Sequence, residues 1–404
     1  MGHFIQKLVH IGPTTWFGLV LLLGLCGGEL AKKIRFLPGI FGYITVGFLI
    51  GPQVFNLVEP SILQQSRLFI DISLGLVLFS TGRNLDFSWL RHNRSLLGMS
   101  LAESGLTFVL LFTVLIFLKL PLLSAALAST IAMVTSPAVL IMVTSDLNSH
   151  GPITRRALML TSLNNFYALL IFTLLLPFAK SNSWSFFQIT WNFIYHLCGA
   201  VILAAVMFSI TQQLAKLIGK TQEKQFILLT GITILTIGLT HKFHLSTMLT
   251  LFVLGVAARN FDLQHRLTAV NFEALARLFL IILFVLVGIY LRPQGISEII
   301  LIVAAFIIVR ILAKFIGVGL FAKASRLTLR QTFATSLALM PLAGVALGMS
   351  FMVIDLNPQL GTLVVTIVSG ALAIMNLIGP ITAQWAFLLV GEAESVETDK
   401  RVLI

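Results

Sequence analysis

Apolar segments of membrane-spanning length, separated by short polar loops, follow one another along almost the whole chain of 404 residues. A transmembrane helix needs about 20 mostly apolar residues to cross roughly 30 Å of hydrocarbon. On this criterion we place spans at residues 14–31, 37–55, 66–84, 96–118, 122–145, 153–178, 190–213, 225–240, 243–259, 273–291, 297–320, 332–354 and 361–389. The pattern predicts an all-α polytopic membrane protein of about 13 transmembrane helices. One transmembrane domain covers residues 1–390, and residues 391–404 form a short solvated cytoplasmic tail.

Composition agrees with this architecture and limits the partners. The chain is 57% hydrophobic and only 10% charged, whereas soluble domains carry about 25% charged residues. The net charge of +12 does not indicate nucleic-acid binding, because most lysines and arginines fall in the loops on one side of the predicted bundle. The positive-inside rule then places the N-terminus outside and the C-terminus in the cytoplasm. The expected partners are membrane lipid and a small solute, with no nucleic acid.

Two stretches of the chain look like copies of one another. A glycine-bearing span at 37–51 is followed by an apolar span at 68–85, and a similar pair occupies 245–260 and 275–291. Within them, "LGLVLFSTGRNL" (74–85) parallels "LIILFVLVGIYL" (280–291). The starts of the copies are seven spans apart, and an odd number reverses the direction of insertion. This is typical of the inverted repeats of secondary transporters, which we place at about 37–178 and 243–389.

The repeat makes the fifth and twelfth spans equivalent, and both are interrupted. The fifth contains Thr135-Ser136-Pro137, and the twelfth contains Pro341 followed by two glycines. Proline removes a backbone donor and disfavours helix in the residue before it. Simple kinks are one reading, since such residues are frequent in membrane helices. Interruptions at corresponding places favour two broken, crossing helices that line a solute site near mid-membrane.

Of the ionisable side chains within predicted spans, we take four as candidates for function, because a charge inside a membrane is costly. Arg310 and Lys314 stand four residues apart on one face of the eleventh span. Glu103 lies about two turns into the fourth span, and Asp71 lies near the outer end of the third. Lys314 at the helix end can instead extend to the interface, and Asp71 and Glu103 can be interfacial carboxylates. A carboxyl group in an apolar setting is nevertheless a suitable proton carrier, and Glu103 and Asp71 are the candidates.

Asn164 and Asn165 occupy the middle of the sixth span. Their amide oxygens can contact a cation and their amide hydrogens an anion. Hydrogen bonding between helices is the alternative role for such side chains. We find no phosphate-binding loop, metal-ligand cluster or nucleophile arrangement in the sequence, so we expect neither an enzyme nor a resident metal or cofactor.

Four segments carry a family resemblance. They are "LPGIFGYITVGFLIGP" (37–52), "SLGLVLFSTGRNLDF" (73–87), "IAMVTSPAVLIMVTSDLNSHGPITRRALMLTSLNNFYALLIF" (131–172) and "HLSTMLTLFVLGVAARN" (244–260). With them the chain resembles the monovalent cation:proton antiporter superfamily, in the branch of bacterial sodium/proton and potassium-efflux antiporters. The resemblance implies thirteen helices, a dimerising scaffold, a six-helix core and exchange of a proton for Na⁺ or K⁺ by alternating access. It also implies a homodimer in the cytoplasmic (inner) membrane.

The same resemblance assigns roles to residues. The essential cation- and proton-binding aspartate falls on Asn165, its polar partner on Asn164, and the basic residue facing it on Lys314 or Arg310. The polar pair of the broken helix falls on Thr135 and Ser136. Asparagine cannot release a proton near neutral pH, so the proton carrier must lie elsewhere, with Glu103 the best candidate. Two alternatives stay open: a carrier of anions or neutral solutes on the same fold, and a non-transporting sensor or assembly subunit.

Overall fold

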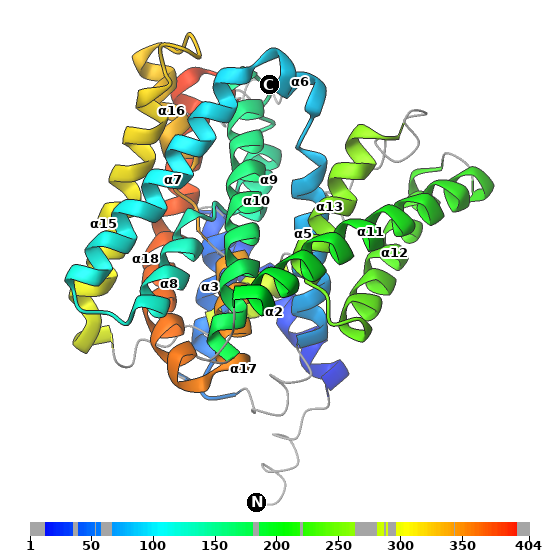
Figure 1. The fold of residues 1–404 in the computed structure, drawn as a ribbon, viewed down its shortest axis with the longest axis horizontal. Coiled ribbons are helices and arrows are strands. Elements are labelled where there is room, and N and C mark those ends of the chain that lie inside the picture. Colours follow the sequence, from blue (N-terminus) through cyan, green and yellow to red (C-terminus); the bar gives the residue numbers. More distant parts are fainter. Residues whose placement is uncertain are drawn as a thin grey trace, which may run out of the picture.

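The computed structural model describes residues 13–34, 39–52, 54–57, 67–180, 186–218, 221–262, 281–286, 288–289, 296–342 and 344–393. Within these ranges the regular elements are all helices, as Figure 1 shows. The first half comprises α2 (Pro13–Lys32), α3 (Gly39–Ile50), α5 (Arg67–Arg83), α6 (Phe87–His92), α7 (Arg94–Phe117), α8 (Leu122–Met133), α9 (Pro137–Asp146) and α10 (Pro152–Lys180). The second half comprises α11 (Phe186–Ile218), α12 (Gln222–Lys242), α13 (Thr247–Asn260), α15 (Ile296–Leu320), α16 (Leu329–Ala338), α17 (Gly344–Leu356) and α18 (Pro358–Val390).

Eight of the described segments are long and apolar enough to cross a membrane. The interrupted pair α8–α9 counts as one of them, and α3, α13 and the first part of α17 are shorter apolar helices. The predicted all-helical, multi-pass architecture is confirmed. The predicted tenth span, 273–291, lies mostly outside the described residues, so the number of spans stays a prediction.

Several helix ends follow from local sequence. Ser246 caps α13 by accepting a hydrogen bond from a backbone amide. Thr328 and Gln331 form a reciprocal capping box at the start of α16. The last helix, α18, ends at Gly391, whose left-handed conformation (φ 72°) suits a residue without a side chain.

The helices pack as two groups. The panel group consists of α2, α3, α5, α11, α12 and α13, with its closest packing between α5 and α13 and between α2 and α3. The bundle group consists of α7–α10 and α15–α18, with α7 against α15 and with α16 and α17 against α18. Both interrupted helices, α8–α9 and α16–α17, belong to the bundle group. In Figure 1 the bundle group stands at the left and α11–α13 of the panel group at the right.

Two close helix contacts within or beside the panel group are mediated by glycine. A Cβ atom added to Gly47 of α3 would lie 1.9 Å from the Val285 carbonyl oxygen and 3.0 Å from the Gly288 Cα. A Cβ atom added to Gly255 of α13 would lie 2.0 Å from a carbonyl oxygen of α5 and 3.1 Å from the Gly82 Cα. Only glycine allows the backbones to approach this closely.

These two contacts correspond under the alignment of the two sequence copies. That alignment pairs Gly47 with Gly255 and Gly82 with Gly288. It also pairs Val285 with Phe79, whose carbonyl oxygen is the one that faces Gly255. Each copy therefore supplies the same two glycine surfaces, and the first surface of each copy packs on the second surface of the other copy. This reciprocity supports the internal repeat.

Asp86 links the two groups at the end of the molecule where α6 lies (Figure 1). It precedes α6, and its Oδ1 accepts hydrogen bonds from the backbone amides of Ser88 (3.0 Å) and Trp89 (3.1 Å). Its Oδ2 accepts from Arg259 of α13 (2.8 Å) and from Arg155 of α10 (3.1 Å). One carboxylate thus joins a panel helix to a bundle helix.

The charge of Asp86 is strongly favoured in this setting. Partial burial alone would raise the pKa of the Asp86 carboxyl. The hydrogen bond from Arg259, those from the Trp89 amide and the Ser88 hydroxyl, and the charge of Arg259 outweigh burial. Together they hold the pKa well below the ordinary aspartate value, so Asp86 stays ionised at neutral pH.

The first turn of α10 binds a residue from the predicted tail. Glu392 follows the end of α18, and its carboxylate accepts hydrogen bonds from the amides of Ile153 (2.8 Å) and Thr154 (2.7 Å) and from the Thr154 hydroxyl (2.8 Å). A carboxylate at a helix N-terminus satisfies free amides and is favoured by the helix dipole. Glu392 is therefore bound to α10 rather than solvated, while residues 394–404 lie outside the described part.

Candidate functional site

The two helix interruptions meet. The first lies between α8 and α9, where Ser136 caps α9 by accepting from the Val139 amide (3.3 Å) and Pro137 occupies the first helical position. The second lies between α16 and α17. The Ser136 amide donates to the Pro341 carbonyl oxygen across the junction (2.8 Å), and the Thr135 hydroxyl lies 3.4 Å from the Leu339 carbonyl oxygen. The predicted breaks are present, and they are hydrogen-bonded to each other.

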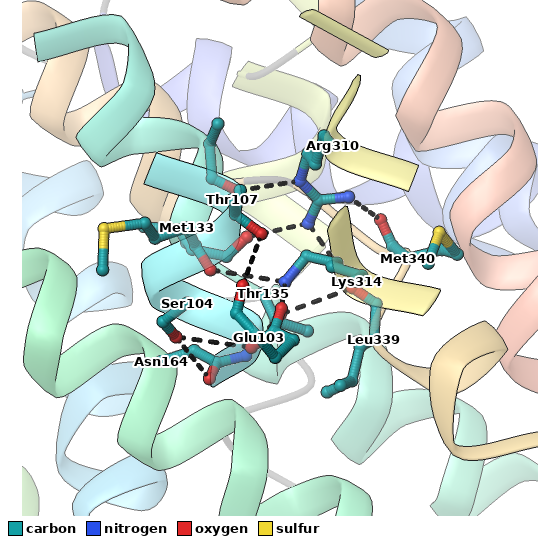
Figure 2. A network of polar contacts seen from close by, with 12 residues as sticks. Glu103, Ser104, Thr107, Met133, Thr135, Asn164, Arg310, Lys314, Leu339 and Met340 are labelled. Atoms are coloured by element: carbon teal, nitrogen blue, oxygen red, sulfur yellow. Dashed lines mark hydrogen bonds and ion pairs between the residues drawn. The ribbon is translucent and has the colours of Figure 1, made fainter. Parts of the chain in front are cut away.

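Arg310 of α15 fills the space between the breaks and is fully buried. Its guanidinium donates to carbonyl oxygens on both sides, as Figure 2 shows in part. The acceptors are Ala132 (2.9 Å) and Val134 (2.8 Å) at the end of α8, and Met340 (2.7 Å), with longer contacts at 3.4 Å to Leu339 and Pro341, at the end of α16. The C-terminal carbonyl groups of a helix have no partners within it and carry partial negative charge. One fixed cation therefore neutralises two half-helix ends at once.

Lys314, one turn further along α15, forms a buried ion pair with Glu103 of α7. Neither side chain has measurable exposure. The ammonium also donates to the Thr135 hydroxyl (3.1 Å) and lies 3.5 Å from the Met133 carbonyl oxygen. The resemblance implies an aspartate at position 165 opposite this lysine, where the chain has asparagine. Lys314 is instead paired with the Glu103 carboxylate of α7.

Gly317 explains how α7 comes close enough for this pairing. A Cβ atom at this position would lie 2.3 Å from the Glu103 Cα, so any larger residue would push the two helices apart. Gly317 is three residues from Lys314, on the same side of α15. Sequence reasoning did not identify it, although a glycine one turn from an intramembrane lysine is a usable signal of close helix approach.

The asparagine pair lies on α10, beside the first break. The Asn164 Oδ1 accepts from the Ser104 hydroxyl (2.8 Å), and its Nδ2 lies 3.3 Å from the Thr135 hydroxyl. The Asn165 Nδ2 donates to the carbonyl oxygens of Thr135 (2.8 Å) and Thr161 (2.8 Å). All of these side chains are buried.

Thr135 connects the asparagines with the ion pair. Its hydroxyl accepts hydrogen bonds from the Lys314 ammonium and the Asn164 amide, and its carbonyl oxygen accepts one from the Asn165 amide. Figure 2 shows Thr135 between Glu103, Lys314 and Asn164. The cluster thus contains one carboxylate, two cations and several neutral oxygens in a setting without solvent exposure.

The structure brings most of the predicted site residues together. Asn164, Asn165, Thr135, Ser136, Glu103, Lys314 and Arg310 gather at the junction of the two breaks. Asp71 lies apart from them, with its carboxylate 3.8 Å from the His241 ring and 37% of its side chain exposed. Ser104 and Thr161 belong to the cluster and were not predicted. Their positions, next to Glu103 and one turn before Asn165, are the only sequence signals that point to them.

The described residues hold no cluster of three or more His, Cys, Asp or Glu side chains arranged for a metal ion. The polar centre of the bundle group consists of one ion pair, one guanidinium and neutral oxygens. This set of groups can exchange a proton and can coordinate a monovalent cation.

Comparisons with known proteins agree with this fold. No curated protein sequence matches the chain. Two solved structures of the sodium proton antiporter MjNhaP1 from Methanocaldococcus jannaschii share its fold. The structure at pH 8 has a TM-score of 0.73 at 17% identity, and an electron-microscopy structure has 0.74 at 18%. Each comparison covers 94% of this chain and 98% of the other.

A family model described as the transmembrane sodium/hydrogen exchanger matches residues 18–389. This range contains every residue of the cluster and nearly all of the described helices. The resemblance predicted from four sequence segments is therefore confirmed over most of the chain. The chain belongs to the sodium/hydrogen exchanger family.

Proposed function

We propose that this protein exchanges a monovalent cation, Na⁺ or K⁺, for a proton across a membrane, and that the Glu103–Lys314 pair carries the proton. Membership of the exchanger family supports the reaction class. The position of Thr135 is the observation that carries the site assignment. It contacts both the ion pair and the asparagine pair. A cation bound at the asparagines would therefore change the electrostatic potential at the ion pair.

The assignment of the proton follows from the titratable groups in the cluster. Asparagine does not titrate near neutral pH, and arginine remains charged in proteins. Arg310 is also bound to backbone carbonyls at both helix ends. Only Glu103 and Lys314 are left, and they contact each other directly. The pair therefore holds the one exchangeable proton.

Cation binding and proton release are coupled by charge. A cation held by the Asn165 amide oxygen would add a second positive charge to the buried cluster that contains the Lys314 ammonium. Like charges in a setting of low dielectric repel strongly, so the pair gives up its proton to water as the cation binds. Reprotonation of the pair expels the cation. The anion-carrier alternative required an unpaired buried cation, whereas Lys314 is paired with Glu103 and Arg310 with carbonyl oxygens.

Alternating access would come from movement of the bundle group, which contains the site, against the panel group. We further propose a homodimer in the cytoplasmic membrane, with the N-terminus outside and the C-terminus in the cytoplasm. The distribution of lysine and arginine among the loops supports this orientation.

Removal of the Glu103 carboxylate tests the proposal. In liposomes containing the purified protein and an internal pH-sensitive dye, addition of NaCl or KCl should drive proton movement in the wild type. Glu103→Gln should abolish this response, and Glu103→Asp should retain it with a shifted pH profile. Glu223→Gln, at an exposed position at the start of α12, is the matched control and should behave as wild type.

A second variant covers the case in which Glu103→Gln does not fold because Lys314 is left unpaired. Combining Glu103→Gln with Lys314→Met removes both charges, and this protein should fold without exchanging protons. Cation-driven proton movement by either folded variant would show that the proton is carried elsewhere.

A further inference from the structure

The orientation of the Asn165 amide is fixed by its partners. Its Nδ2 lies 2.8 Å from two carbonyl oxygens, those of Thr135 and Thr161. Carbonyl oxygens only accept hydrogen bonds, so a flipped amide would place oxygen against oxygen twice. The Oδ1 atom must therefore point the other way, where it is buried without a hydrogen-bond partner.

A second oxygen in the same condition lies one helical turn away. Among the residues that the structure describes, the buried Thr161 Oγ1 also has no hydrogen-bond partner. Residues four apart lie on the same face of a helix, so both oxygens belong to one face of α10. An unsatisfied buried polar atom is costly, and oxygens with free lone pairs on one helix face can contact a bound cation.

The two unsatisfied oxygens are both neutral. One belongs to a side-chain amide and the other to a hydroxyl group. The one carboxylate of the cluster, Glu103, is held by Lys314 on the other side of Thr135. Neutral oxygen dipoles exert a weaker field on a cation than a carboxylate does, and field strength is one determinant of selection among monovalent cations.

Field strength decides which ion gains more from binding than it loses in hydration. Small, strongly hydrated ions such as Li⁺ and Na⁺ need a strong field to replace their water, and divalent cations are usually held by carboxylates. Larger, weakly hydrated ions give up water at lower cost and are satisfied by neutral oxygens. We infer that the Asn165–Thr161 face of α10 selects weakly hydrated monovalent cations, K⁺ and Rb⁺, over Na⁺ and Li⁺. This inference rests on the proposed exchange function and names its preferred substrate.

Two measurements on the full chain test the selectivity. Thermal unfolding of the purified protein in detergent, with KCl, RbCl, NaCl or LiCl at constant ionic strength set by choline chloride, reports binding, because a ligand stabilises the state that binds it. Proton movement in liposomes, titrated with each salt, reports exchange. We expect K⁺ and Rb⁺ to act at concentrations about tenfold lower than Na⁺ and Li⁺ in both assays.

Asn165→Asp provides the decisive variant, because it adds a carboxylate with little change in shape. It should shift the preference toward Na⁺ and Li⁺ by about tenfold. Asn357→Asp is the matched control, since Asn357 caps α18 through its side-chain oxygen and the same substitution there should leave the ratio of K⁺ to Na⁺ unchanged. Thr161→Val should weaken K⁺ binding and serves if Asn165→Asp does not fold.

The outcomes separate this inference from the proposed function. A wild type that binds and exchanges Na⁺ at lower concentrations than K⁺ would overturn the selectivity and leave the exchange intact. Preferential stabilisation by K⁺ without any cation-driven proton movement would support the site and contradict the exchange. Equal responses to all four salts, together with an unchanged ratio of K⁺ to Na⁺ response in Asn165→Asp, would show that the cation does not bind at this face of α10.

Discussion

At the scale of single residues, the buried negative charge of the site comes from α7, where Glu103 pairs with Lys314. Asn165 occupies the position where the sequence resemblance places an aspartate, and Glu103 supplies the negative charge from α7 instead. The compensation depends on three residues: the lysine, the glutamate and Gly317, which lets their helices approach. A substitution at any one of them should therefore disturb the interaction that involves the other two.

The energetic coupling of the ion pair can be measured directly. Lys314→Met alone leaves a buried carboxylate without its partner and should destabilise the protein by about 3–5 kcal/mol. The double variant Glu103→Gln/Lys314→Met should cost less than the sum of the single changes, since no isolated charge remains. Thermal unfolding in detergent at neutral pH gives the comparison, and strictly additive effects would mean that the two groups do not interact.

The sequence alone identified most residues of this site, but it did not show which of them contact one another. The depth of Glu103 and Lys314 in apolar spans marked both as unusual, because charges there are costly. Nothing in the spacing of residues 103 and 314 shows that they meet, since contact between α7 and α15 depends on how the whole bundle packs. The unpartnered oxygen of Asn165 also required the structure, because it follows from which atoms the amide nitrogen contacts.

At the scale of elements, two interrupted helices share one counter-charge. Pro137 and Pro341 predicted the interruptions from backbone chemistry, and both were found. The role of Arg310 was not foreseen, because the resemblance implied only that Lys314 or Arg310 faces Asn165. Its hydrogen bonds go to the carbonyl ends of α8 and α16 instead, and such contacts depend on where helix ends meet in space.

Because Arg310 is shared by two helix ends, Arg310→Lys should destabilise the protein more than the same substitution at an exposed arginine. Arg310→Lys keeps the charge but loses the planar fork of donors, so several buried carbonyls lose their partners at a cost of about 1–3 kcal/mol each. Arg310→Met should be worse still. Arg330→Lys, at an exposed position in α16, is the control. Unfolding temperatures in detergent rank the variants, and an Arg310→Lys protein as stable as wild type would show that charge alone suffices.

At the scale of the whole molecule, the described helices fall into the panel and bundle groups, and packing between the groups is sparser than packing within them. Membrane-spanning periodicity and the repeat predicted a multi-pass bundle, but the division into groups emerges only from packing. The Asp86 connection is one tie that crosses the boundary. Any sliding of one group along the other must rearrange it.

The pH dependence of this tie follows from the depressed pKa of Asp86. Because the folded-state pKa lies below the unfolded value of about 3.9, the stability that the carboxylate contributes is present above that value. It is lost as pH falls through the folded-state pKa. Asp86→Asn should therefore reduce stability by a roughly constant amount, about 1 kcal/mol, between neutral and mildly acidic pH.

The difference between wild type and Asp86→Asn should shrink once the pH falls below about 4. Unfolding temperatures across this range check the prediction. Glu29→Gln, which removes an exposed pair with Lys32, should have a smaller effect at every pH. A difference for Asp86→Asn that grows in acid would contradict the assigned role.

The bond between Glu392 and the first turn of α10 has a practical consequence for anyone producing this protein. That turn begins the helix on which both asparagines stand. A purification tag or fluorescent fusion attached close behind Ala393 would compete for the space in which the glutamate docks, and truncation before it would leave backbone amides exposed. A long, uncharged spacer keeps the contact intact, so reporter signals would reflect the unaltered transporter rather than one with a loosened helix.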